Sequence, residues 1–207
     1  MGFTIFRCMN PGSYYHVFNH ANGDENLFRE EDNYHYFLKQ WAKYIEPVAD
    51  TYAYCLMPNH FHALVRTKDF RQSDLQGFQN LEGLKNQEPS KRIIQAFSNL
   101  FNSYSKAYNK MYDRRGSLFE HGFKRKEITS DAYLTAVMVY IHHNPVHHGF
   151  CDRIENWPHS SFHSLLSSQP SKLARQAVLD WFGDAVGFRQ SHRVMLELPD
   201  HSLLIDF

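Results

Sequence analysis

The strongest constraint on the fold is the order in which two hydrophobic periodicities follow each other. Apolar runs of strand length occupy residues 14–19, 51–57, 61–66 and 123–128. Apolar residues spaced three and four apart, the pattern of an amphipathic helix, occupy 31–45, 93–111 and 131–144. The order β-α-β-β-α-β-α predicts an α+β fold, a ferredoxin-like antiparallel sheet with helices packed on it, followed by a C-terminal helical tail.

Proline residues mark two boundaries within this pattern. Pro58-Asn59 suits the centre of a tight turn, so the runs on either side of it predict a hairpin. We expect Pro145 to end the third helix at about Asn144, because proline lacks the N–H that a helix interior requires. Residues 67–90 are polar and interrupted by glycine and proline, which favours a loop.

Length and composition favour one principal domain. The chain has 207 residues, 43% of them hydrophobic, and we expect a main domain at 10–161 and a tail of unassigned role at 162–207. No apolar run is long enough to span a bilayer, so we expect a cytoplasmic protein without a membrane partner. The three cysteines form no CxxC pair, which argues against a disulfide framework or a zinc ribbon.

The net charge is zero, but basic residues are concentrated in one segment. Residues 91–126 hold nine Lys/Arg and two Asp/Glu, with aromatic residues interleaved among them. Such a segment suits single-stranded nucleic acid, because phosphates bind the cations and bases stack on the rings. A solvated helix face is an equally good explanation of the charges alone. The candidate DNA-binding residues are Arg114, Arg115, Lys124, Arg125 and Lys126.

The second hairpin strand begins with His60-Phe61-His62. Alternate residues of a strand point to opposite faces, so both imidazoles project together while Phe61 enters the core. This arrangement offers a pair of metal ligands. Alone it is a weak signal, because two histidines at this spacing are more often hydrogen-bonded or solvent-facing.

The third helix places Tyr140 and Asn144 on one stripe, four residues apart. A phenol and an amide would then face the histidines together. From spacing alone, a core tyrosine and a helix-ending asparagine are the better interpretation. We interpret four nearby histidines as helix-end residues rather than metal ligands: His142, His143, His147 and His148.

Two longer segments carry a family resemblance. Residues 54–62 (YCLMPNHFH) and 140–146 (YIHHNPV) resemble the two motifs of the HUH single-tyrosine transposases, in particular the branch associated with repetitive extragenic palindromes. Shorter segments at 15–17, 116–120, 123–124 and 157–161 agree, so the resemblance extends over residues 14–161. Two motifs in this order and structural context are more specific than either one.

The resemblance implies a role for each matching position. His60 and His62 would ligate a divalent metal, Mg²⁺ or Mn²⁺, and Asn144 stands where the family supplies a third ligand. Some relatives carry glutamine at that helix position. Tyr140 would be the nucleophile, forming a 5′-phosphotyrosine intermediate.

The function that follows is a transposase and endonuclease that cleaves and rejoins single-stranded DNA with hairpin-containing ends. One alternative is a non-catalytic single-stranded nucleic-acid-binding module, although the chain lacks the aromatic stacking motif of RNA-recognition domains. A second is a metal-dependent phosphoesterase that activates water, in which Tyr140 would be dispensable. The sequence leaves open whether the protein acts as a monomer or a homodimer.

Overall fold

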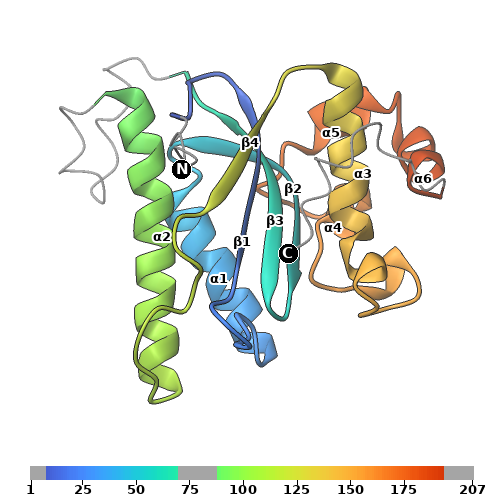
Figure 1. Ribbon diagram of the computed structural model, residues 1–207. Coiled ribbons are helices and arrows are strands. Elements are labelled where there is room, and N and C mark those ends of the chain that lie inside the picture. Colours follow the sequence, from blue (N-terminus) through green and yellow to red (C-terminus); the bar gives the residue numbers. More distant parts are fainter. Residues whose placement is uncertain (1–7, 70–87, 194–207) are drawn as a thin grey trace, which may run out of the picture.

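The expected α+β fold is confirmed in the computed structural model, which describes residues 8–69 and 88–193 (Figure 1). Four strands form one antiparallel sheet in the ferredoxin-like order β2-β3-β1-β4. The strands are β1 (Tyr14–His20), β2 (Ala49–Met57), β3 (His60–Thr67) and β4 (Lys124–Ile128). β2 and β4 are the edges of the sheet.

Helices cover both faces of the sheet (Figure 1). One face packs against α1 (Glu31–Tyr44) and α2 (Pro89–Met111). The other packs against α3 (Asp131–His147) and the shorter elements that follow it, η3 (Ile154–Asn156), α4 (Phe162–Leu166), α5 (Arg175–Trp181) and α6 (Ala185–Arg193). Within residues 8–69 and 88–193, every helix is too short or too polar to cross a lipid bilayer.

Strand β3 lies between the two hydrophobic cores. Phe61 is completely buried against α1 and α2, where its ring lies 5.3 Å from that of Phe37 and 5.8 Å from that of Phe101, measured between centroids. Leu64, on the opposite face, is buried in the core that α3 completes. The alternation predicted from the sequence therefore assigns His60 and His62 to the α3 side.

Two helix boundaries differ from the expectations. α3 does not stop at Asn144 but continues through Pro145 to His147. Proline removes only its own N–H bond, and the following amides still reach the helix, with His148 N–H donating to Asn144 O at 3.0 Å and Phe150 N–H to Pro145 O at 2.8 Å. α2 begins at Pro89, four residues early, because proline suits the first turn of a helix. Most of the expected loop, residues 70–87, lies outside the described residues.

The helices after residue 161 share a core with the sheet. Phe162, Leu165, Val178 and Phe188 are all buried with the side chains of α3 and β2. The backbone of Tyr54 on β2 is also paired with this segment, since Ser161 N–H donates to Tyr54 O at 2.9 Å. Residues 162–193 therefore contribute apolar contacts to the face that carries the histidines, while 194–207 lie outside the described residues.

We expect Phe188→Ala to lower the free energy of unfolding by about 3–5 kcal/mol, the usual loss for a buried phenylalanine. Phe188 is completely buried in α6, whereas Val186 in the same helix is 57% exposed. Urea denaturation followed by circular dichroism should show one transition that Phe188→Ala shifts and Val186→Ala hardly changes. A separate early transition for the tail, with the main one unshifted, would show that residues 162–193 fold independently of the sheet.

Candidate functional site

The predicted histidine pair lies on the α3 side of β3. His60 and His62 are 3% and 2% exposed, and they face the same way because one residue separates them along the strand. In the pairing of β1 with β3, His20 lies opposite His60 and Phe18 lies opposite His62. Side chains of β1 therefore flank the two imidazoles along the sheet, and α3 covers them from above the sheet.

The ring of His60 is oriented by the residue before it. Its Nδ1 lies 2.8 Å from Asn59 Oδ1, and because that oxygen only accepts, Nδ1 carries the hydrogen and donates. The neutral ring then has its lone pair on Nε2. This atom is buried, and it has no hydrogen-bond partner among the described residues. His60 thus presents an unused electron pair inside the protein.

His62 is oriented in a similar way, but by another histidine. Its Nδ1 lies 2.9 Å from Nε2 of His16 on β1. Burial lowers the pKa of His16 and of His60 to about 3, and it lowers the pKa of His62 well below the usual value. All three rings are therefore neutral at pH 7, the state in which an imidazole binds a cation.

Helix α3 brings the two other predicted site residues to the histidines. The ring of Tyr140 stands edge-on to His62 and to His16, with centroids 5.7 and 6.0 Å apart. Asn144, one turn later, is completely buried, and its Nδ2 donates to the Tyr140 carbonyl at 3.1 Å. Its Oδ1 has no hydrogen-bond partner among the described residues. Tyr140, Asn144, His60 and His62 therefore share one enclosed site.

The donor set fits a divalent cation. A buried polar atom without a partner costs about 1–3 kcal/mol, and two such atoms, His60 Nε2 and Asn144 Oδ1, belong to side chains that lie beside each other. A bound cation would satisfy both. No group of three His, Cys, Asp or Glu side chains in 8–69 and 88–193 is arranged as a metal site. The ligands would be two imidazoles and an amide, with the remaining positions left to water or phosphate oxygens.

Three histidines at this site were not assigned to it from the sequence. Besides His16, His20 stacks on His60 at a centroid distance of 5.6 Å, and His148 stands edge-on to His60 at 4.6 Å. Strand alternation puts His16 and His20 on one face of β1, which was the available signal. His148 is the C-cap of α3, as its interpretation as a helix-end residue implies, but it also faces the site.

His142 belongs to a different buried group. Its Nδ1 lies 2.8 Å from His192 Nε2 on α6, and its Nε2 lies 2.7 Å from Ser161 Oγ. These contacts attach the tail to the opposite side of α3 from the candidate site. This histidine is therefore a hydrogen-bonded core residue.

The predicted DNA-binding residues fall into two groups. Lys124 and Lys126 of β4 pair with Phe18 and His16 of β1, so they share the face of the histidines, and the Lys126 ammonium lies 5.7 Å above the Tyr133 ring. The other residues of the set point elsewhere. Arg125 stacks on Phe123 of the opposite face, Arg114 pairs with Glu25 at 2.6 Å, and Arg115 is exposed beyond the end of α2.

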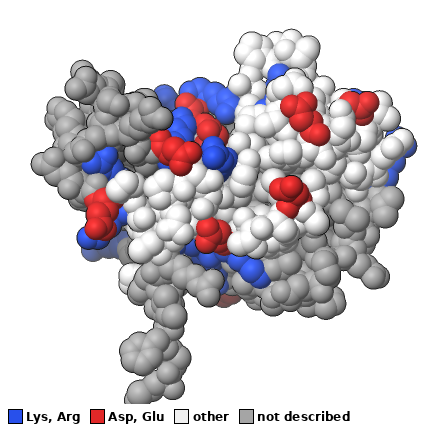
Figure 2. Space-filling view, turned by 90° about the horizontal axis from the view of Figure 1, so that it is seen from above, with Lys and Arg blue, Asp and Glu red and all other residues white. Residues whose placement is uncertain are grey.

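Elsewhere on the surface, charges of opposite sign lie together. Figure 2 shows acidic and basic side chains side by side on the face seen from above. At the end of the sheet where β3 finishes, Arg66 lies 3.6 Å from Asp69, and Lys68 lies 3.4 Å from Asp50. Such pairs reduce the positive potential available to phosphates there. Lys124 is itself paired with Glu120 at 3.3 Å, but it and Lys126 share the face of the histidines, which makes them the better-placed cations for a strand that reaches the site.

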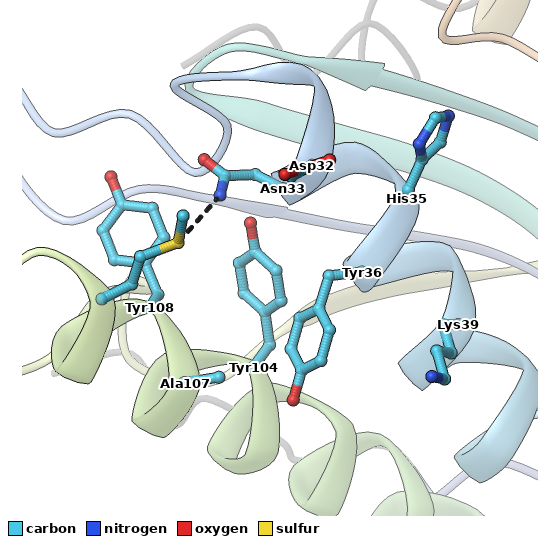
Figure 3. Close-up of a pocket in the computed structure, with 9 residues that line it drawn as sticks. Asp32, Asn33, His35, Tyr36, Lys39, Tyr104, Ala107 and Tyr108 are labelled. Atoms are coloured by element: carbon cyan, nitrogen blue, oxygen red, sulfur yellow. Dashed lines mark hydrogen bonds between the residues drawn. The ribbon is translucent and has the colours of Figure 1, made fainter.

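A cavity of about 440 Å³ lies on the other side of the sheet, between α1 and α2 (Figure 3). Its walls are largely apolar and include the rings of Tyr36, Tyr104 and Tyr108. The hydroxyls of Tyr104 and Tyr108 both donate to backbone carbonyls, so these polar groups are already used. The cavity contains none of the residues that the sequence assigned to chemistry.

Comparison with known proteins agrees with the family resemblance. No family model matches the chain. A Haemophilus influenzae protein named as a REP-associated tyrosine transposase is 29% identical over 114 residues, which are 55% of this chain and 59% of that protein. The match thus spans less than two thirds of the relative's length.

A solved structure of a REP-associated tyrosine transposase bound to a REP hairpin has the same fold, with a TM-score of 0.57 and 17% identity. The superposition covers 82% of this chain and 89% of the other. At this identity the likeness establishes the fold. The resemblance expected from the two motifs is therefore confirmed by both sequence and fold.

We expect His60→Ala to weaken Mn²⁺ binding by about a hundredfold or more, since loss of an outer partner alone costs about 10–100-fold. Asn144→Ala should have a smaller effect, about tenfold, because water replaces one amide ligand more easily. Titration calorimetry measures both. The control is His35→Ala, an exposed histidine on α1. Unchanged Mn²⁺ affinity in a His60→Ala, His62→Ala double variant would place the metal site elsewhere.

Proposed function

We propose, from the resemblance to the REP-associated tyrosine transposases, that this chain is a metal-dependent single-strand DNA endonuclease and strand transferase. The observation that carries the proposal is the position of the Tyr140 ring against the neutral, buried rings of His62 and His16. The proposed nucleophile and the proposed metal ligands therefore belong to one enclosure, which supports the proposal. The proposed substrate is a DNA single strand with a hairpin, and the similar solved structure is bound to a REP hairpin.

His60, His62 and Asn144 are the proposed ligands of Mg²⁺ or Mn²⁺. When bound, such a cation withdraws charge from a phosphodiester and orients it for in-line displacement. The protein's part is to keep both imidazoles neutral through burial and to hold their rings through Asn59 and His16. Two imidazoles and an amide do not by themselves select Mg²⁺, and zinc or nickel could occupy such a site in vitro.

Tyr140 is the proposed nucleophile. Its oxygen would attack the phosphorus and form a 5′-phosphotyrosine, while the 3′-oxygen of the cleaved strand leaves and takes up a proton. The phenolic proton passes to water. A phenol has a reference pKa near 10, far below that of an alcohol, so it is easier to activate and leaves more readily. Attack by a 3′-hydroxyl on the phosphotyrosine then rejoins a strand without an external energy source.

The site is largely closed to solvent. Tyr140 is only 4% exposed, and Asn144 and both ligand histidines are buried as well. We propose that part of the surrounding structure shifts to admit a phosphate to the phenol. Lys124 and Lys126 lie on the edge strand of the same face, and we propose that they guide the backbone of the incoming strand.

The burial of Tyr140 favours one second candidate, a binding module without catalysis. In that case the tyrosine is a core aromatic residue, and the neutral histidines are packing groups. The two functions differ in one measurable product, because only the enzyme forms a covalent protein–DNA adduct. A phosphoesterase that activates water would cleave the strand without forming that adduct.

Tyr140→Phe should keep the fold and DNA affinity but abolish the covalent adduct, because only the attacking oxygen is removed. A 3′-labelled single strand incubated with Mn²⁺ retains its label on the protein in a denaturing gel if the link is a 5′-phosphotyrosine. Tyr133→Phe, which removes a phenol two turns earlier in α3, is the matched control and should form adduct normally. Near-normal cleavage by Tyr140→Phe would identify water or another residue as the nucleophile.

Replacing Lys124 and Lys126 together by alanine should flatten the salt dependence of single-strand binding. Each lost phosphate contact changes the slope of log K against log salt by about 0.7, so the double variant should change it by about 1.4. Fluorescence anisotropy at several salt concentrations measures the slope. Lys39→Ala with Lys43→Ala, on α1 at the opposite face, is the matched control. An equal change in both double variants would contradict a DNA path along β4.

A further inference from the structure

We propose that His16 is a positioning residue, which holds the ring of His62 in the orientation and tautomer that bind the metal. The inference rests on the proposed function, because it concerns a ligand of the proposed cation. His16 belongs to β1 and lies 46 positions from its partner in the sequence. Only the pairing of β1 with β3 brings the two rings together.

The geometry restricts the His62 ring on two sides. Its Nδ1 lies 2.9 Å from His16 Nε2, and the two ring planes differ by 24°. Phe18, the residue opposite His62 in the strand pairing, stacks on the same ring with an interplanar angle of 17°. Phe18 limits the tilt of the imidazole, whereas His16 contacts a nitrogen and therefore also affects where the hydrogen lies.

Two arrangements of the hydrogen between the rings are chemically available, and only one suits a metal ligand. A neutral imidazole carries one N–H. If His62 Nδ1–H donates to His16 Nε2, the lone pair of His62 is on Nε2, where a cation can bind it. If His16 donates instead, the single hydrogen of His62 must be on Nε2, and that atom cannot bind a cation. Metal binding thus requires His16 to accept.

The two ligand histidines differ in this respect. His60 Nδ1 faces the Asn59 side-chain oxygen, which can only accept a hydrogen bond. Only the neutral tautomer of His60 with hydrogen on Nδ1 fits this contact. His62 faces a group that can accept or donate. The proposal therefore assigns His16 the accepting tautomer in the metal-free protein, which pre-organises His62 as a ligand.

The experiment compares two substitutions of His16 that differ in hydrogen bonding. His16→Leu removes the acceptor, and we expect Mn²⁺ affinity to fall about 10–100-fold. His16→Gln keeps an acceptor near the position of Nε2, and its affinity should stay within about threefold of wild type. Titration calorimetry gives the affinities. Adduct formation at saturating Mn²⁺ should recover in His16→Leu, because the nucleophile and the ligands are intact.

The matched control is a second buried pair of hydrogen-bonded histidines. His192 is 2% exposed and contacts His142 at 2.8 Å, on the side of α3 away from the candidate site. His192→Leu and His192→Gln should both bind Mn²⁺ as the wild type does. A loss of affinity in these variants equal to that of His16→Leu would show a general packing effect and overturn the proposal.

The remaining outcomes separate this inference from the proposed function. If the wild type binds no Mn²⁺, the proposed metal-dependent function fails. If it binds Mn²⁺ and folded His16→Leu binds equally well, or His16→Gln binds as poorly as His16→Leu, only the role of His16 fails. Should His16→Leu not fold, nitrogen-15 NMR of the metal-free wild type decides: hydrogen on His62 Nδ1 supports the proposal, and hydrogen on Nε2 overturns it.

Discussion

The alternation of side chains along β3 is the constraint on which the rest of the structure depends. Phe61 is inserted between α1 and α2, and because the period of a strand is two, His60 and His62 must point the opposite way. A shift of one residue in the strand pairing would exchange the faces and put two imidazoles into the aromatic core. The same packing that stabilises one half of the molecule therefore sets the direction of the candidate ligands in the other half.

Burial on the α3 side then determines the chemical state of those ligands. Removal from water disfavours the charged form of each imidazole, which leaves lone pairs inside a closed space. Asn59 contacts Nδ1 of His60, and His16 contacts Nδ1 of His62. These contacts restrict the rotation of both rings, so the direction of each Nε2 is fixed. Asn144 adds an oxygen that has no hydrogen-bond partner among the described residues. An apolar core would be expected to avoid such an arrangement, because unpartnered polar atoms reduce stability.

Local periodicity predicted most of the fold. Spacing put His60 and His62 on one face of a strand, and Tyr140 and Asn144 on one stripe of a helix, but it was the family resemblance that assigned these residues to a site. His16 and the pairing of Arg114 with Glu25 were not found, since both depend on contacts between segments 46 and 89 positions apart. Pro145 was misjudged because a proline in the last turn of a helix removes only one hydrogen bond. What failed was the prediction of which distant segments meet.

Helix α3 lies between the sheet and the tail, and this position limits where the chain can be shortened. Val137 and Ile141 lie in the same apolar cluster as Phe162 and Phe188, so the helix that carries Tyr140 is apolar on the tail side as well as on the sheet side. A shortened chain that ended at residue 161 would expose this second apolar surface to water. Exposed surfaces of that kind promote self-association. The helices between residues 162 and 193 therefore cover a surface of α3 that would otherwise favour self-association.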